Sequence, residues 1–309
     1  MPLDHSMPIP PPVFQPPPQR DILPWLERRR YQLTDANPWL RTALLWGRHH
    51  GFRPNAVFLC EYPKSGGTWL RFMLHEILTT EPSEFRNVNH ASRMVGYHFR
   101  APDVLPGGGR LIATHETWRP AYHKVLYLVR DVRDVALSHY RREWHMGVVS
   151  TTFDAFLLCL MNGPKRHGSW PAHVASYLDS GLARTDRFLL LRFEDLRRNT
   201  AEVLTRIVDF LGARPDREAI NRAVQNNSLE AMRAKEDRVH ALDVRVRMSP
   251  PGSSREEGRF VHKGEVEGWR RKLSAAQLDL IERLAGQSLL RLGYPLSLAD
   301  QQSSAPANA

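Results

Sequence analysis

The chain has 309 residues, a length that suits one α/β domain with additional segments. Lysine and arginine number 43 against 33 for aspartate and glutamate, and the net charge of +10 favours anionic partners: nucleic acid, membrane headgroups or a polyanionic small molecule. The two cysteines, Cys60 and Cys159, exclude a disulfide framework and a cysteine-based zinc cluster. We expect both thiols to be reduced and mostly buried in a cytosolic protein.

Both ends of the chain have compositions that differ from the middle. Residues 1–20 are dense in proline, which predicts a disordered or polyproline II tail, and residues 301–309 predict a second disordered tail. Residues 21–50 carry tryptophan and leucine among arginines and predict a helical extension packed on the main domain at 51–300. We see neither a signal peptide nor an apolar run of the roughly 20 residues that a membrane helix needs, and therefore expect a cytoplasmic protein.

Apolar runs alternate with helical patterns through the main domain. Four runs predict buried strands: AVFLCEY (56–62), RLIATHE (110–116), KVLYLVRD (124–131) and RFLLLRFEDL (187–196). Helical patterns follow at 68–80, from Asp134 and at 201–212. This alternation predicts an α/β fold, a single domain with a central parallel sheet flanked by helices, in which ligands bind at the carboxyl ends of the strands.

The first predicted strand ends in the short loop YPKSGGTW (62–69). Free amides at the start of the following helix and the helix dipole favour an anion there, and glycines let the backbone approach it closely. The loop does not match the nucleotide P-loop G-x-x-x-x-G-K-[ST], because Lys64 precedes the glycines. The sequence predicts a P-loop-like loop whose lysine reaches beyond the phosphate that it holds, with an ordinary strand–helix turn as the alternative.

Two further basic motifs agree with an anionic ligand. Arg130 ends a predicted strand, with Ser138 eight residues on, so that this arginine is placed to bind a phosphate bidentately; an ion pair with Asp134 is the alternative. Near the C-terminus, residues 262–264 (HKG) form another short basic loop, which taken alone predicts a solvated surface loop. The three motifs together predict two anion sites for one ligand.

At these residues the sequence resembles the cytosolic type of sulfotransferase, enzymes that use 3′-phosphoadenosine 5′-phosphosulfate (PAPS). YPKSGGTW resembles the family's 5′-phosphosulfate loop, usually YPKSGTTW, with Gly67 in place of threonine. VRDVRDVALSHY (129–140) resembles the 3′-phosphate motif, and KGEVEGW (263–269) is similar to the C-terminal signature, with His262 replacing the arginine before it. LRFEDL (191–196) and NNSLEAM (226–232) resemble two further segments of the nucleotide site.

The resemblance implies a role for each of these positions. Residues 65–69 would hold the 5′-phosphate, with Trp69 on the adenine, while Arg130, Ser138, Ser228 and residues 262–264 would hold the 3′-phosphate. The implied nucleotide-binding residues are Lys64, Ser65, Gly66, Gly67, Thr68, Trp69, Arg130, Ser138, Phe193, Ser228, His262, Lys263 and Gly264.

The same resemblance identifies two catalytic residues. ATHETW (113–118) resembles the family's K-T-H segment, which places His115 on the general base and Ala113 where many members carry lysine. The alternative for His115 is a hydrogen-bonded histidine of the core. Lys64 would stabilise negative charge on the leaving phosphate, and no metal is expected.

The implied reaction moves the sulfuryl group of PAPS to a hydroxyl or amine of a small-molecule acceptor, such as a phenol, alcohol, sugar or natural product. Residues 81–109, 141–151 and 233–260 would frame the acceptor pocket. We expect no nucleic-acid or membrane partner, and a homodimer is left open because the family's dimer motif is matched only in part. Two alternatives are a P-loop nucleotide kinase-like phosphotransferase and a basic protein that binds nucleic acid or membrane surfaces.

Overall fold

The computed structural model describes residues 37–48, 51–85, 87–88, 103–145, 149, 151–163, 167–242 and 259–297. The expected tails at 1–20 and 301–309, and residues 21–36 of the expected helical extension, lie outside these residues. Part of each segment expected to frame the acceptor pocket also lies outside them.

A four-stranded parallel sheet forms the centre of the protein. Its strands are β1 (Val57–Glu61), β2 (Leu111–Thr114), β3 (Val125–Val129) and β4 (Phe188–Arg192), in the order β2-β1-β3-β4. β1 pairs with both β2 and β3, so that Cys60 lies between Thr114 and Tyr127. The α/β class with a parallel sheet is confirmed, and the two-sided burial of β1, β2 and β3 explains their continuous apolar runs.

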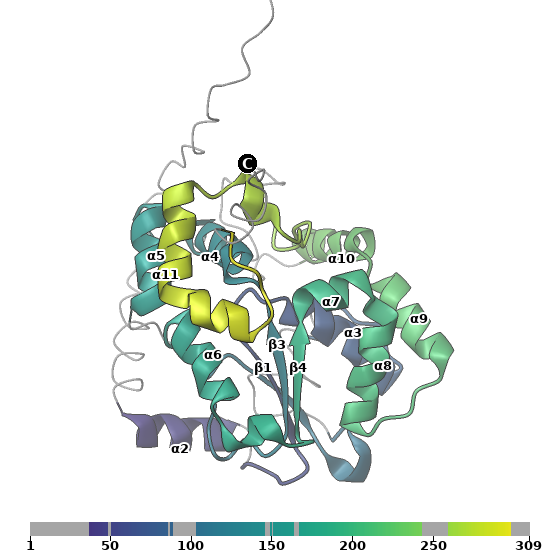
Figure 1. Ribbon diagram of the computed structural model, residues 1–309. Helices are drawn as coiled ribbons and strands as arrows, with labels where there is room; N and C mark the ends of the chain where they lie inside the picture. The colour runs from purple at the N-terminus through teal and green to yellow at the C-terminus, as the bar shows by residue number, and fades with distance from the viewer. Residues whose placement is uncertain are drawn as a thin grey trace, which may run out of the picture.

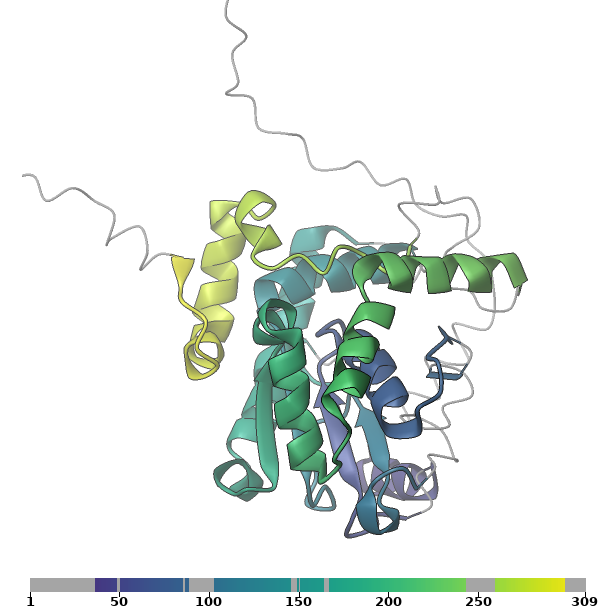
Figure 2. The same ribbon diagram turned by 90° about the vertical axis from the view of Figure 1, so that its right-hand side faces the viewer.

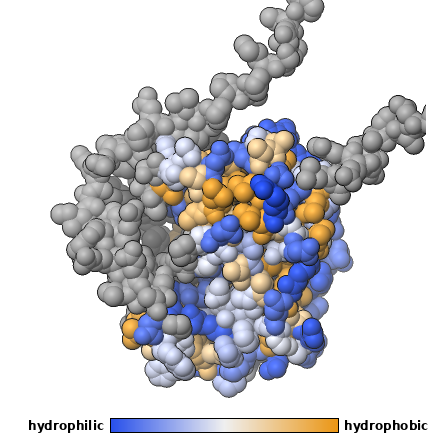
Figure 3. Space-filling view, turned by 60° about the vertical axis from the view of Figure 1, so that its left-hand side comes forward, coloured by the Kyte–Doolittle hydropathy of each residue, from blue (hydrophilic) through white to orange (hydrophobic). Residues whose placement is uncertain are grey.

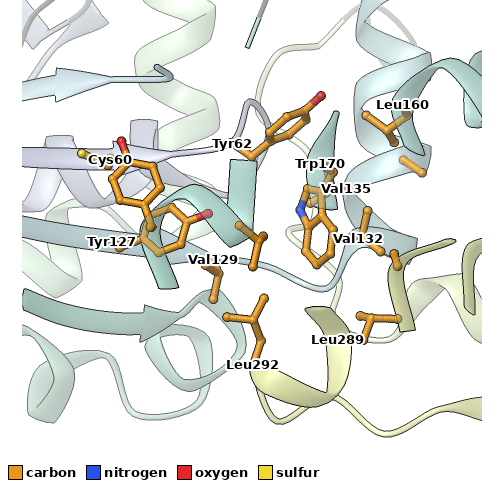
Figure 4. Packing of buried hydrophobic residues seen from close by; sticks show 14 of the residues in the cluster. Cys60, Tyr62, Tyr127, Val129, Val132, Val135, Leu160, Trp170, Leu289 and Leu292 are labelled. Carbon is orange, nitrogen blue, oxygen red and sulfur yellow. The ribbon is translucent and has the colours of Figure 1, made fainter. Parts of the chain in front are cut away.

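Helices cover both faces of this sheet (Figure 1). One layer holds α4 (Val132–His145), α5 (Phe153–Asn162), α6 (Trp170–Leu178) and α11 (Ala275–Arg291). The other holds α3 (Gly67–Thr79), α8 (Thr200–Leu211) and α9 (Arg217–Asn226). Alternate residues of β1 pack against opposite layers. Phe58 and Cys60 contact the first layer, and Val57 and Leu59 contact the second. Figure 4 shows strand side chains meeting those of α4, α5, α6 and α11 in the first layer.

The other helices among the described residues lie around this core: α2 (Pro38–Arg48), α7 (Phe193–Arg198) and α10 (Leu229–Leu242), with the short 3₁₀ segments η2 (Pro106–Gly108), η3 (Gly181–Arg184) and η4 (Gly268–Arg271). Leu45 and a buried ion pair between Arg41 and Glu116 attach α2 to the domain. α10 lies across the end of the molecule toward which the strands run (Figure 2). No described helix is long and apolar enough to cross a membrane.

Two expectations about individual segments were wrong. The run 187–196 is not one strand, because β4 ends at Arg192 and α7 begins at Phe193. Glu194 and Asp195 in the first turn of α7 favour a helix start there, and Asp195 binds the Arg192 side chain at 3.0 Å. Cys159 is exposed rather than buried, because it lies on the solvent side of α5, whereas Cys60 is buried. On the face shown in Figure 3, hydrophobic residues gather in the upper part, with hydrophilic residues around and below them.

Candidate active site

The loop between β1 and α3 has the conformation that an anion site needs. Gly66 lies in the left-handed region at φ 104°, and a Cβ there would overlap the ring of Phe193. Lys64 is also left-handed, at φ 76°. The hydroxyl of Ser65 is buried and has no hydrogen-bond partner among the described residues. A buried donor without a partner beside a helix start fits a phosphate oxygen.

Glu61 contributes a carboxyl group to this loop that sequence reasoning missed. Its Oε2 accepts a hydrogen bond of 2.5 Å from the amide of Gly67, the first residue of α3, and its side chain is buried. Burial raises the pKa of Glu61 to about 7, although Arg71, the Gly67 amide and Lys64 act in the opposite direction. An acidic residue at the end of a buried apolar strand was the available signal.

The contact between the Glu61 carboxyl and the Gly67 amide also explains why residue 67 has no side chain. A Cβ at this position would overlap the Glu61 carboxyl group, so the threonine that is usual in the resembling family cannot coexist with Glu61 in this rotamer. The absence of a side chain at residue 67 and the position of the Glu61 carboxyl are therefore linked sterically.

One basic cleft brings together residues from three separate motifs. Its lining is Lys64, Ser138, Arg141, Arg142, Arg259, Phe260 and His262. The Lys64 ammonium lies 5.0 Å from the centre of the Phe260 ring. Burial, followed by the charges of Arg142, Arg130 and Arg141, lowers the pKa of Lys64 to about 7. Cations gathered in this way favour binding of an anion. The sequence analysis had the three arginines of this lining only within the segments 141–151 and 233–260, which were expected to frame the acceptor pocket, and not among the nucleotide-binding residues.

Arg130 lies just beyond β3 and joins the loop to the C-terminal motif. Its guanidinium donates to the carbonyl oxygens of Lys64 at 3.3 Å and Glu265 at 2.8 Å, and its Nε is buried without a partner among the described residues. Among the described residues, Arg130 and Asp134 form no direct ion pair, although the Asp134 charge still acts on the Arg130 guanidinium. Asp134 instead accepts the Trp269 amide at 3.0 Å, which fixes the end of the C-terminal motif against α4.

Phe193 lies among the other predicted nucleotide-binding residues. The Arg130 guanidinium lies 4.6 Å from its ring centre, the Trp69 ring meets it edge-on at 6.2 Å, and a Cβ on Gly264 would touch it. Four predicted residues, including Gly66, thus surround the Phe193 ring.

Three other predicted residues lie toward the rim of the site: Thr68, Ser228 and Lys263. Trp69 donates from its indole nitrogen to the carbonyl oxygen of Asn227 at 2.7 Å, and this bond places Ser228 near the loop. The Ser228 side chain is exposed and caps α10 by accepting the Ala231 amide at 3.2 Å. Lys263 is exposed, and Thr68 accepts a hydrogen bond from Arg71 at 3.1 Å.

His115 lies directly beyond β2, beside the end of β1. Its Nδ1 is 3.0 Å from the carbonyl oxygen of Glu61. Because a carbonyl only accepts, Nδ1 carries the hydrogen, and Nε2 of the neutral ring keeps its lone pair. Burial lowers the pKa of His115 to about 3, so the ring is neutral at pH 7. Within the described ranges, no group of three or more His, Cys, Asp and Glu residues is arranged to hold a metal ion.

The fold is that of an α/β protein with a short glycine loop between its first strand and the helix that follows. A family model described as the sulfotransferase domain matches residues 54–293, and the chain belongs to this family. It is therefore a sulfotransferase rather than a kinase-like phosphotransferase or a basic binding protein.

Relatives and solved structures agree with this assignment. Sulfotransferase 2B1 of Homo sapiens is 29% identical over 247 residues, which are 75% of this chain and 65% of that protein. Sulfotransferase 1A1 of Canis lupus familiaris is 28% identical over 244 residues, 73% of this chain and 80% of that protein.

Two solved structures share the fold. Retinol dehydratase in complex with androsterone and the inactive cofactor PAP has a TM-score of 0.58 at 20% identity, over 77% of this chain and 81% of that one. A mouse sulfotransferase complexed with PAP has a TM-score of 0.56 at 22% identity, over 77% and 85%.

Proposed function

We propose that this sulfotransferase takes its sulfuryl group from PAPS and transfers it to a hydroxyl or amine of a small-molecule acceptor, with His115 as the general base. The observation that carries the proposal is the basic cleft, in which Lys64, Ser138 and His262 come from three distant motifs. PAPS has a 5′-phosphosulfate and a separate 3′-phosphate, so it needs two anion sites. The PAP bound in the two structures of similar fold supports the same donor.

The residues of the site fit this donor in two groups. Residues 65–69 would hold the 5′-phosphate, where the Ser65 hydroxyl is a buried donor that has no protein partner in the described ranges. Arg130, Ser138, Ser228 and residues 262–264 would hold the 3′-phosphate, and the unpartnered Nε of Arg130 is the matching donor. Trp69 and Phe193 would contact the adenine end.

The residues would then divide the chemistry as follows. His115 Nε2 accepts the proton of the acceptor hydroxyl while the acceptor oxygen forms its bond to sulfur. The bond between sulfur and the bridging oxygen breaks, and its electron pair stays on the phosphate of the leaving PAP, where Lys64 stabilises the charge. An in-line, loose transfer of this kind depends mainly on positioning and charge stabilisation. The Lys64 pKa of about 7 would rise beside an anion, so the ammonium form is retained when the donor is bound.

The proposal also covers partners and location. The acceptor would be a phenol, alcohol, amine, sugar or natural product, and the retinol dehydratase structures, which hold androsterone or retinol, support a small molecule. We propose that neither a metal nor nucleic acid nor a membrane takes part, and that the enzyme works in the cytoplasm. Whether the enzyme acts as a monomer or as a homodimer is left unassigned.

A binding and turnover experiment tests this function. Calorimetry should show that the protein binds PAP more tightly than ATP with magnesium. Labelled PAPS should then give a sulfated product with a member of a panel of phenols, alcohols, amines and sugars. An absence of PAP binding would overturn the donor, and ATP-dependent phosphorylation of the panel would overturn the reaction.

A further inference from the structure

Glu61 places an acidic group inside a site that is otherwise built for an anion. Its carboxyl is buried, with 6% of the residue exposed, and lies on the Gly67 amide at 2.5 Å. Its other oxygen lies 3.9 Å from Nδ1 of His115. The carboxyl therefore lies between the donor loop and the histidine, and the chemistry described above does not use it.

An ionised carboxylate here would repel the 5′-phosphate and compete with it for the first amide of α3. Glu61 ends a fully buried strand, and its side chain is itself buried. Protonation in place removes the repulsion, while the Gly67 amide stays bonded to the carboxyl. A neutral carboxyl has an O–H that donates a hydrogen bond to an oxygen of the phosphate.

We propose that Glu61 is a positioning residue of the donor site, which binds a proton when the donor binds and donates its O–H to the 5′-phosphosulfate. In this role it replaces the hydroxyl that is missing at Gly67, the residue whose lack of a Cβ makes room for it. The inference rests on the proposed function, because it needs PAPS as the donor. Because Glu61 has to be protonated when the donor binds, donor binding weakens as the pH rises.

The surroundings of Glu61 agree with this role. The charged or titratable groups that face it are Lys64 in the loop, Arg71 on α3 and His115 after β2, with Cys60 next to it in β1. Its pKa of about 7 leaves it partly protonated at neutral pH, and a phosphate beside it raises this pKa further. Lys64 also gains a proton when an anion binds, so an experiment has to separate the two groups.

Calorimetry of PAP binding separates them. The Lys64→Met variant removes the neighbouring titration, and Lys64→Met/Glu61→Gln differs from it only at Glu61. Titrations at pH 6 to 8.5, in two buffers of different ionisation enthalpy, give both the affinity and the number of protons taken up. Because loss of the Lys64 charge raises the pKa of Glu61 above 7, we expect Lys64→Met to take up a larger fraction of a proton than the double variant as the pH rises to 8.5. Above the pKa of Glu61, its affinity should fall by up to about tenfold more per pH unit.

Further variants test the hydrogen bond itself. Glu61→Gln keeps a donor and should bind PAP with an affinity that no longer follows this titration, whereas Glu61→Leu should bind more weakly at every pH. Infrared difference spectra should show a protonated carboxyl appearing when PAP is added at pH 8, absent in Glu61→Gln. Equal proton uptake with and without Glu61, or no carboxyl band, would overturn the inference while leaving PAPS as the donor. If the wild type binds no PAP, the proposed function itself fails.

Discussion

The carbonyl oxygen of Glu61 and Nδ1 of His115 lie 3.0 Å apart, across the junction of β1 and β2. This hydrogen bond fixes the tautomer of the histidine and leaves Nε2 as the acceptor for a proton. Because the parallel register pairs Cys60 with Thr114, the contact is a consequence of the sheet and not of a mobile loop.

His115→Ala should reduce turnover by about 10²- to 10⁴-fold, the usual contribution of a general base. Its affinity for PAP should stay close to that of the wild type, since no predicted phosphate contact is removed. Steady-state kinetics and calorimetry measure the two quantities separately. Near-normal turnover would exclude His115 as the base.

Arg130→Ala should weaken PAP binding by about 1.5–3 kcal/mol, the range for a hydrogen bond to a charged group. Adenosine 5′-monophosphate, which lacks the 3′-phosphate, provides the control. The variant and the wild type should bind it with nearly equal affinity once both are measured by calorimetry. An equal loss for both nucleotides would show that Arg130 acts on the loop through its bonds to Lys64 and Glu265.

Gly66→Ala should lower the free energy of unfolding by more than Gly212→Ala. Both glycines have a left-handed backbone conformation. A Cβ at residue 66 would overlap the Phe193 ring, whereas a Cβ at residue 212 would have no atom within 4 Å. Gly212→Ala should cost about 1 kcal/mol from backbone strain alone, and Gly66→Ala about 1–3 kcal/mol more. Urea unfolding of the two variants gives the difference, and equal losses would contradict the close contact with Phe193.

The stability of the wild type relative to Glu61→Gln should fall as the pH rises from about 4.5 to about 7. The pKa of Glu61 is raised in the folded protein from 4.5 to about 7, so the folded state holds a proton that the unfolded chain releases within this window. The difference amounts to ~3 kcal/mol over the window. Urea unfolding of both proteins at several pH values measures it, and a constant gap would show that the carboxyl is not shifted.

Arg133→Leu should destabilise the protein by about 3–5 kcal/mol, because it leaves two buried carboxylates without their cation. Arg133 is buried, lies 2.7 Å from Asp131 and 3.2 Å from Glu282, and connects α4 to α11. Arg222→Ala, which removes an exposed pair with Glu218, is the control and should change stability by no more than about 0.5 kcal/mol. Similar values for the two variants would mean that the buried pair contributes little.

Much of the site could be predicted because its parts are local. A glycine loop after a buried strand predicts an anion site from backbone geometry, whatever lies elsewhere in the chain. The bounds of β1, β2 and β3 were predicted to within a few residues, because burial on both faces of the sheet makes each run continuously apolar. The prediction for 187–196 failed because Phe193 and Leu196 extend the apolar run beyond the strand, although Glu194 and Asp195 in the first turn of α7 mark the start of the helix.

The sequence by itself determined the class of fold, the anion loop and the three motifs, since each depends on residues that are close in the chain. Only the tertiary structure decided which groups meet. It brought Lys64, Ser138 and His262 into one cleft, placed three further arginines around it, and put the Glu61 carboxyl on the Gly67 amide. These contacts depend on strand order, register and burial, because side chains far apart in sequence interact only after the sheet has aligned the ends of its strands.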